Sequence, residues 1–296
     1  MKWAKDNIPL RRQSDNLNGI SPAEEISTKA EFGDAVQALS PLKSDNSALA
    51  ALGIHVAYGN TRVLHDIYCH FPATSVTAIM GPSGCGKSTF VKVLNRTLEL
   101  TLNARVESGS VLFHDRDIYG DNEDPLEVRK RIGIIHQRPI IFPMSVAENV
   151  LFGARFHRQI VGMKPREYAE MYIDQVGLLD EVKDRLDNLA SELSGGQQQR
   201  LCLARTLAIN PEIILMDEPC SAIDPIATER IEELIATLRD SYTIIIVTHN
   251  MSQAKRISNQ AVFMFAGRII EAGDRDTMFS NPQTELAQRF IQGSIG

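Results

Sequence analysis

The sequence lacks a long apolar run. None of the hydrophobic stretches in its 296 residues approaches the ~20 residues that a membrane-spanning helix needs. Residues 1–20 also lack an apolar segment of the kind found in secretory signals, so we expect no signal peptide. The sequence therefore predicts a chain without a membrane-spanning helix of its own.

Cysteine is also scarce, and the chain has no excess of positive charge. The four cysteines, Cys69, Cys85, Cys202 and Cys220, show neither metal-site spacing nor a disulfide framework. Cys85 lies inside a glycine-rich loop whose fold a disulfide would disturb, so a reducing cytoplasm is the simpler compartment. The formal net charge of −6 argues against general nucleic-acid binding, and we expect no nucleic-acid partner.

The chain divides into a polar beginning and a regular remainder. Residues 1–48 are polar, mixed in charge and without clean periodicity, which predicts a disordered or loosely packed tail with one short helix at most, at Glu31–Leu39. Residues 49–296 carry regular hydrophobic patterns and are predicted to form one domain. Residues from about 138 to 193 lack strand-like runs, so we expect them to form an inserted helical subdomain.

Strand-like runs alternate with helical patterns through this domain, which predicts an α/β fold with a parallel sheet and a β-rich subdomain. The expected strands are Ala50–Val56, Val63–Phe71, Ser75–Met80, Gly109–His114, Ile132–His136, Ile213–Glu218 and Tyr242–Thr248, followed by a hairpin of Ala261–Phe265 and Arg268–Glu271. The expected helices are Phe90–Asn95, Leu126–Arg131, Val146–Phe152, Arg166–Val176, Leu178–Val182, Ser194–Ala208, Ile226–Leu238 and Gln283–Gln292.

A glycine-rich loop follows the strand Ser75–Met80 and opens the next helix. It fits the pattern G-x-x-x-x-G-K-[ST] of a phosphate-binding loop with the residues Gly81, Pro82, Ser83, Gly84, Cys85, Gly86, Lys87, Ser88 and Thr89. Glycines let successive backbone N–H groups point inward at an anion, and the helix N-terminus adds partial positive charge. Lys87 would reach the β- and γ-phosphates, and the Ser88 hydroxyl would ligate Mg²⁺. The loop therefore predicts a site for a nucleoside triphosphate with Mg²⁺.

Polar side chains follow three of the buried strands. Asp217 and Glu218 end the strand Ile213–Glu218, where one carboxylate can hold Mg²⁺ and its neighbour can orient or deprotonate an attacking water. Gln137 and His249 each follow another strand. Either alone would be an ordinary loop residue, but parallel strands bring such residues to one edge of the sheet. We therefore expect both to contact the γ-phosphate or the water.

A second glycine pair opens a helix at Ser194, Gly195, Gly196 and Gln197, and this helix end can bind an anion as the first one does. Because one chain carries a single phosphate loop, the second end is predicted to serve the nucleotide of another molecule. Tyr58, in the turn between the first two strands, is a candidate to stack on an adenine ring and equally a candidate for a buried tyrosine.

The sequence Leu193-Ser-Gly-Gly-Gln197 resembles the signature motif of ATP-binding cassette ATPases. With Gly81–Thr89, Gln137, Ile213–Glu218, Ser221–Asp224 and His249, it reproduces the motifs of that family in their order. The resemblance implies a head-to-tail dimer with two ATP molecules, each held between one chain's phosphate loop and the other chain's signature motif. It also implies that Tyr58 stacks on adenine, that Glu218 is the catalytic base and that His249 is the switch histidine. Gln137 would link the γ-phosphate to the helical subdomain and contact Mg²⁺ together with Ser88 and Asp217.

A narrower resemblance, to the ATPase subunits of bacterial phosphate importers, rests on Leu94–Arg96, Phe142–Ser145, Met216–Ala222 with Asp224-Pro225, and Thr248–Met251. It implies ATP-driven import of inorganic phosphate, with permease subunits as partners and an external phosphate-binding protein as an indirect one. The expected location is the cytoplasmic face of the inner membrane, as a peripheral subunit. Two alternatives stay open at this point: an importer ATPase for an amino acid or another oxyanion, and a soluble ATP-binding cassette ATPase that does not act in transport.

Overall fold

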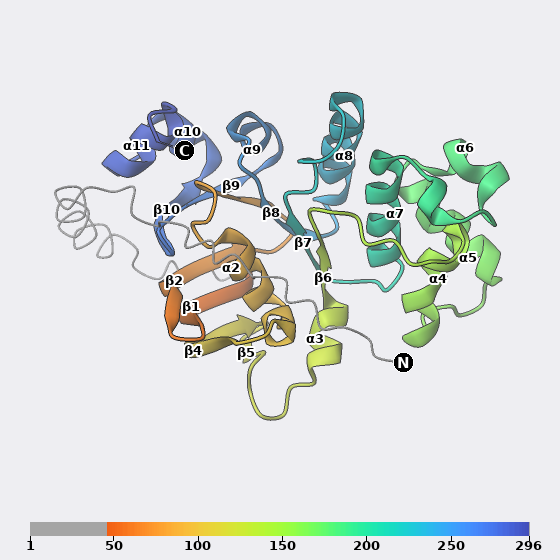
Figure 1. Cartoon of the computed structure of the whole chain (residues 1–296), viewed down its shortest axis with the longest axis horizontal. Coiled ribbons are helices and arrows are strands. Elements are labelled where there is room, and N and C mark those ends of the chain that lie inside the picture. The colour runs from red at the N-terminus through yellow and green to blue at the C-terminus, as the bar shows by residue number, and fades with distance from the viewer. Residues whose placement is uncertain (1–45, 296) are drawn as a thin grey trace, which may run out of the picture. The chain divides into compact units, whose positions relative to one another are not determined.

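The computed structural model describes residues 46–295 (Figure 1). The tail predicted for residues 1–48, and the short helix at Glu31–Leu39, fall almost wholly outside these residues. Within residues 46–295, none of the helices has the length and apolar character needed to cross a membrane.

A six-stranded sheet forms the centre of the described chain, in the order β10-β9-β3-β8-β7-β6. Its strands are β3 (Val76–Met80), β6 (Ile132–Ile135), β7 (Ile213–Asp217), β8 (Thr243–Val247), β9 (Gln260–Phe265) and β10 (Arg268–Asp274). All neighbours pair in parallel except β9 and β10, which form the predicted hairpin. Every residue of β3, β7 and β8 is buried, because helices and the second sheet cover both faces of these strands. The predicted parallel sheet is therefore confirmed.

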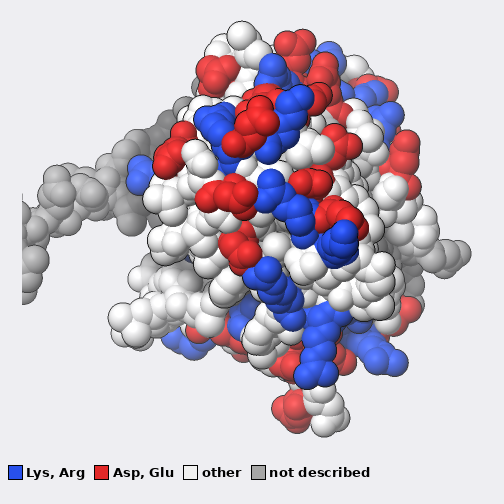
Figure 2. Space-filling view, turned by 90° about the vertical axis from the view of Figure 1, so that its right-hand side faces the viewer, with Lys and Arg blue, Asp and Glu red and all other residues white. Residues whose placement is uncertain are grey.

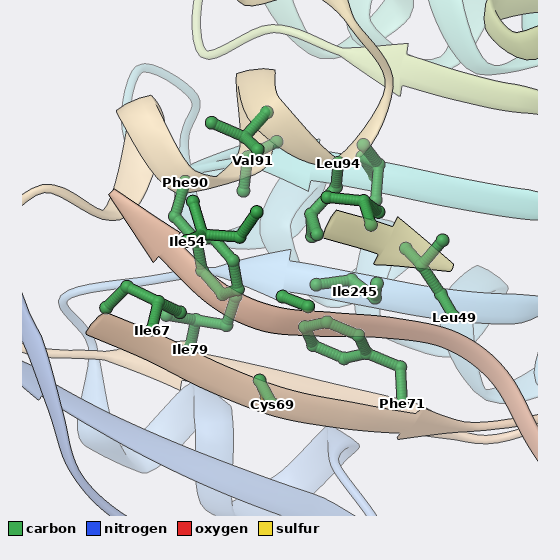
Figure 3. Close-up of a cluster of buried hydrophobic side chains, with 14 of the residues drawn as sticks. Leu49, Ile54, Ile67, Cys69, Phe71, Ile79, Phe90, Val91, Leu94 and Ile245 are labelled. Atoms are coloured by element: carbon green, nitrogen blue, oxygen red, sulfur yellow. The ribbon is translucent and has the colours of Figure 1, made fainter. Parts of the chain in front are cut away.

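A second, four-stranded antiparallel sheet has the order β2-β1-β4-β5 and corresponds to the predicted β-rich part. Its strands are β1 (Ser47–Tyr58), β2 (Thr61–Pro72), β4 (Ala104–Phe113) and β5 (Arg116–Asp117). Helix α2 (Lys87–Leu94) lies between the two sheets. Figure 3 shows Ile54 and Phe71 of this sheet beside Phe90 of α2, with Ile79 and Ile245 from the central sheet in the same buried cluster. This cluster fixes the position of the phosphate loop, because α2 starts at the loop's last residues.

Helices dominate the segment between β6 and β7, and they lie together at the right of Figure 1. The segment contains α4 (Val146–Phe156), α5 (Pro165–Gln175), α6 (Leu179–Val182) and α7 (Gly195–Leu207). The Tyr168 hydroxyl of α5 donates a hydrogen bond of 2.8 Å to the carbonyl oxygen of Ala208, directly after α7. The helices before α7 and α7 itself are thus held together from within the protein interior.

The remaining helices flank the central sheet: α3 (Pro125–Arg131), α8 (Pro225–Leu238), α9 (Met251–Ile257), α10 (Arg275–Ser280) and α11 (Glu285–Ile291). The sequence did not predict α9 and α10, which have only seven and six residues. Each follows a side-chain cap, since Asn250 accepts from the N–H of Gln253 and Asp274 accepts from the N–H groups of Asp276 and Thr277. Both helices therefore begin at a side-chain cap that the sequence prediction did not use.

Several strand ends differ from the prediction, and two of these differences concern predicted site residues. Strand β7 ends at Asp217, and Glu218 takes a left-handed backbone conformation with a φ of 49°. Tyr58 belongs to the end of β1 and pairs with Thr61, so that only two residues make the turn. The reversal at Glu218 turns the chain sharply after the buried strand, which a hydrophobic pattern alone does not reveal.

Candidate nucleotide-binding site

The loop Gly81–Gly86 joins β3 to α2 by a backbone path that side chains would obstruct. Gly81, Gly84 and Gly86 all have positive φ angles, of 152°, 77° and 106°. A Cβ atom on Gly81 would lie 2.1 Å from the carbonyl oxygen of Met264, and one on Gly86 would lie 2.6 Å from a methyl carbon of Leu64. The loop is therefore packed against β2 and β9, and only glycine fits at both positions.

The side chain of Lys87 lies inside this loop and bonds its backbone. Its side chain is buried, and its Nζ donates hydrogen bonds to the carbonyl oxygens of Gly81 at 2.8 Å and Pro82 at 2.9 Å. The Cys85 thiol is buried beside it, and burial raises the pKa of this thiol in spite of the nearby Lys87 charge. A lysine that is almost fully buried without a carboxylate partner among its hydrogen bonds is suited to receive an anionic ligand.

Ser88 and Asp217 bring two oxygen atoms together next to the loop. The Ser88 hydroxyl donates a 2.9 Å hydrogen bond to Asp217 Oδ1, although the two residues lie 129 positions apart in the sequence. Burial raises the pKa of Asp217, against the opposing effect of the Ser88 hydrogen bond, and the neighbouring Glu218 raises it further. Hydroxyl and carboxylate oxygens are the ligands that Mg²⁺ prefers, so this pair fits the predicted metal site.

Glu218 connects the polar residues that follow three parallel strands. Its Oε2 accepts a hydrogen bond of 3.2 Å from Nε2 of Gln137 and lies 3.1 Å from Nδ1 of His249. Its own N–H donates to the carbonyl oxygen of Val247, so the left-handed turn is secured by β8. Gln137 follows β6 and His249 follows β8, and the sheet places both beside the residue that follows β7.

Tyr58 is held by a polar contact to the helix of the phosphate loop. Its hydroxyl lies 3.3 Å from Oγ1 of Thr89, and its partly buried ring packs on the hydrophobic core. In this arrangement Tyr58 has a structural contact of its own, and a role in stacking on adenine stays a prediction.

A cavity of about 340 Å³ lies over the phosphate loop. Among the residues that line it are Lys87 and Ser88 of α2, together with Gln137 and Glu218; the full lining is Val63, Ser83, Gly84, Gly86, Lys87, Ser88, Thr89, Gln137 and Glu218. Six of the predicted loop residues thus meet Gln137 and Glu218 at one hollow. Asp217 and His249 do not line it but bond residues that do, Ser88 and Glu218. None of the lining residues comes from Ser194–Gln197. Helix α7, which Ser194 caps, lies apart from α2 in Figure 1.

The second glycine-containing helix end is built differently from the first. Ser194 caps α7: its Oγ accepts from the N–H of Gln197, and Oε1 of Gln197 accepts from the N–H of Ser194 at 3.0 Å. A Cβ on Gly196 would lie 2.6 Å from the Cβ of Ala227, so this end of α7 packs tightly on the first turn of α8. A Cβ on Gly195 would meet nothing closer than 3.9 Å, which leaves that backbone accessible.

Sequence reasoning missed Glu181, whose Oε2 accepts a 2.9 Å hydrogen bond from Nε2 of Gln197. It also missed Gln199, which donates to the carbonyl oxygen of His136, just before Gln137. No spacing signal could have found these contacts, because the partners lie on separate elements that meet only in the folded chain.

The fold and this site define a class of protein. The sequence profile described as "ABC transporter" matches residues 64–221, and the chain belongs to this family of ATP-binding cassette proteins. The predicted family and fold are thereby confirmed.

Among its relatives, the chain is 46% identical to the phosphate import ATP-binding protein PstB of Synechococcus sp. (strain CC9605) over 259 residues, which are 84% of this chain and 94% of that protein. Among solved structures, it is similar to cbiO1 from Clostridium perfringens, a part of the ABC transporter complex cbiONQ. The TM-score is 0.68 with 26% identity, over 84% of this chain and 100% of the other.

Proposed function

We propose that this chain hydrolyses ATP as one half of a head-to-tail dimer and thereby drives import of inorganic phosphate through a membrane permease. The observation that supports hydrolysis most directly is Glu218, which lines the cavity over the phosphate loop and has both Gln137 and His249 within hydrogen-bond distance of its Oε2. The observation that supports phosphate as the transported solute is the 46% identity to a phosphate import ATP-binding protein.

Binding of the triphosphate is assigned to the loop Gly81–Thr89. Lys87 would exchange its hydrogen bonds to Gly81 and Pro82 for contacts to the β- and γ-phosphates, because charged phosphate oxygens are stronger acceptors than carbonyl groups. The inward N–H groups of the loop and the start of α2 would hold the remaining oxygens. Tyr58 would contribute its ring to the adenine.

Mg²⁺ is assigned to Ser88 and Asp217, with Gln137 as a further oxygen ligand. The hydrogen bond between Ser88 and Asp217 already places two oxygen atoms side by side at the cavity, and amide oxygens are also accepted by this ion. When bound, the ion neutralises charge on the triphosphate.

Proton transfer is assigned to Glu218. Its carboxylate would accept a proton from the attacking water, and the γ-phosphate would be attacked in line. Gln137 and His249 bond the same oxygen, Oε2, so Oε1 is left to receive the proton. His249 would also hydrogen-bond the γ-phosphate and hold its geometry.

The residues Ser194–Gln197 are assigned to the ATP of a second copy. None of them lines the cavity over their own chain's phosphate loop. The first N–H groups of a helix have no acceptor within it, and those of Gly195 and Gly196 can therefore bind phosphate oxygens of a partner.

A permease contact is assigned to exposed apolar side chains on the helical segment. Phe152 and Phe156 lie one turn apart on α4 and are 53% and 70% exposed, and Phe152 packs on Phe142 with a ring separation of 4.9 Å. Ile140 is 50% exposed, and Arg205, which lies over the Phe142 ring, donates to the carbonyl oxygen of Ile140. Exposed apolar side chains of this kind suit a protein partner. The chain would then act as a peripheral subunit on the cytoplasmic face of the membrane.

Transport and substrate are tested in the organism. Disruption of the gene is expected to impair high-affinity phosphate uptake, and tagged protein is expected to co-purify with membrane subunits. If the disruption abolishes uptake of an amino acid or another oxyanion and leaves phosphate uptake unchanged, phosphate is not the transported solute. Absence of any membrane subunit would favour a soluble ATPase outside transport.

The shared site is tested with mixed dimers. Lys87→Ala removes a positive charge at the phosphates, and Gly195→Asp places a negative charge where a partner's γ-phosphate would approach. Each change damages both sites of its own homodimer, whereas in a mixed dimer both lesions fall in one site and the other site is intact. With Glu218→Gln in both chains to trap nucleotide, the mixture is expected to retain more ATP through gel filtration than either variant alone. Mixed dimers that form in a tagged pull-down but retain no more ATP would contradict the shared site.

A further inference from the structure

One carboxylate on the helical segment holds three side chains from two other helices. Glu181 of α6 accepts from Nε2 of Gln197 at 2.9 Å and from Nη2 of Arg200, which lies 2.9 Å from each of its oxygens. Arg230 of α8 donates to Glu181 Oε1 as well. The Arg200 side chain is only 5% exposed, while those of Glu181 and Arg230 are 30% and 50% exposed.

This cluster links the helical segment to the central sheet. α6 and α7 belong to the segment between β6 and β7, whereas α8 begins directly after the turn that follows β7. The ion pair between Glu181 and Arg230 therefore crosses from one part to the other. One turn before Arg230, Ala227 receives the close approach of Gly196, and the carboxylate of Asp224 caps α8 by accepting from the N–H of Ala227 at 2.9 Å. The starts of α7 and α8 are thus joined by a packed contact and a salt bridge.

Glu181 also determines how the amide of Gln197 is oriented. A carboxylate only accepts hydrogen bonds, so the NH₂ group of Gln197 must face Glu181. The amide oxygen then faces back to the N–H of Ser194 and completes the cap of α7. With the N–H groups of Ser194 and Gln197 satisfied by the cap, those of Gly195 and Gly196 are left without an acceptor in the helix, and Gly195 is the exposed residue of the two.

We propose that Glu181 is a positioning residue, which sets the glycine end of α7 relative to the start of α8 so that both meet the nucleotide of a second copy together. This inference rests on the proposed shared site. Glu181 touches no nucleotide; it acts through Gln197 on the helix cap and through Arg230 on the angle between the two helices. The charges support this role. Without the Glu181 carboxylate, Arg200 would be an unpaired buried cation close to the positive N-terminal end of α7.

The test separates positioning from folding. Replacing Glu181 would leave the buried Arg200 without its carboxylate partner and can impair folding. The primary variant is therefore Arg230→Gln, which removes only the ion pair between Glu181 and α8. Arg230→Lys keeps the positive charge and is expected to dimerise more readily with ATP than Arg230→Gln does. The matched control is Arg166→Gln. Arg166 has a similarly exposed side chain, at 46%, and its pairs with Glu170 and Asp187 stay within the helical segment. Acidic and basic side chains are interspersed on the face shown in Figure 2, which is the right-hand side of Figure 1, where the helical segment lies.

Two measurements are compared in the Glu218→Gln background: binding of a fluorescent ATP analogue to dilute, monomeric protein, and the ATP concentration at which half of the protein is dimeric. We expect Arg230→Gln to leave binding of the analogue to the monomer unchanged and to raise the ATP concentration needed for dimerisation about five- to tenfold, which lies within the span of coupling energies for residues in one salt-bridge network. Combined with Glu181→Gln, the two changes are expected to be clearly less than additive.

Three outcomes contradict the positioning role: dimerisation of Arg230→Gln at the same ATP concentration as the Glu218→Gln parent, an equal loss of dimerisation in Arg230→Gln and Arg166→Gln, or weakened binding of the analogue to monomeric Arg230→Gln. If the Glu218→Gln parent itself binds ATP but forms no ATP-dependent dimer, the shared site is wrong and this inference fails with it. If the Glu218→Gln parent does form an ATP-dependent dimer, any of the three outcomes above rules out the positioning role and leaves the proposed function intact.

Discussion

The chain has two glycine-containing helix starts, and they are built by different means. At α2 the N-cap is Gly86, with a left-handed backbone and no side-chain cap, and the loop before it is pressed against Met264 and Leu64. At α7 the N-cap is Ser194, with a capping box completed by Gln197 and supported by Glu181. The first end is fixed by backbone packing, whereas the second combines close packing of Gly196 on Ala227 with side-chain hydrogen bonds and charges.

The difference follows from what each end has to meet. The loop before α2 lines a cavity within its own chain, so its shape can be fixed once, by strands that pack against it. The proposed ligand of α7 belongs to another copy, and its position depends on how the helical segment lies relative to the central sheet. Side-chain contacts such as the one between Glu181 and Arg230 can set that relation without adding bulk near the glycines.

The largest effect is expected from Glu218→Gln, which removes the proposed proton acceptor and leaves the starts of α2 and α7 unchanged. Glutamine keeps the size of the side chain but does not accept a proton, so hydrolysis should fall by about 10²–10⁴-fold. ATP binding should persist, and dimers that hold ATP between the two ends should accumulate. Steady-state ATPase assays and gel filtration with ATP measure both. Near-normal turnover in the purified variant would remove Glu218 from its proposed role.

A medium effect is expected from matched glycine substitutions at the two ends. Gly81→Ala places a Cβ 2.1 Å from a backbone carbonyl and should destabilise the fold by roughly 1–3 kcal/mol, as overpacking does. Gly195→Ala meets nothing closer than 3.9 Å and should leave the melting temperature nearly unchanged. Thermal denaturation of both variants without nucleotide measures the contrast. Equal destabilisation would show that the two ends are built alike.

The smallest effect concerns pH and the cluster at α7. Burial raises the pKa of Glu181, but the hydrogen bonds from Gln197 and Arg200 and the arginine charges outweigh it and hold the pKa below its ordinary value. A lowered carboxyl pKa contributes stability above the unfolded value of about 4.3, and this contribution is lost as the pH falls through the folded value. The stability advantage of the natural chain over Glu181→Gln should therefore shrink on acidification. Melting temperatures between neutral and acid pH measure it, and a constant difference would contradict the role of ionised Glu181.

Much of the site's composition follows from sequence because each part obeys a local rule. A glycine loop between a buried strand and a helix predicts a phosphate site without knowledge of any other residue. Polar residues after Ile132–Ile135, Ile213–Asp217 and Thr243–Val247 meet because parallel strands end at one edge, and the structure brings Gln137, Glu218 and His249 within hydrogen-bond distance. These residues were named from the sequence, although their catalytic roles stay proposals.

The sequence alone therefore determined the family, the order of most strands and helices, and the residues gathered around the phosphate loop, since hydrophobic periodicity and loop chemistry depend on near neighbours. Only the tertiary structure decided that Tyr58 bonds Thr89, that Glu218 has a left-handed backbone and that Glu181 joins three helices. Those contacts depend on angles between elements, which arise from the packing of the whole core. No local pattern of residues contains that information, because the partners approach each other only after the chain has folded.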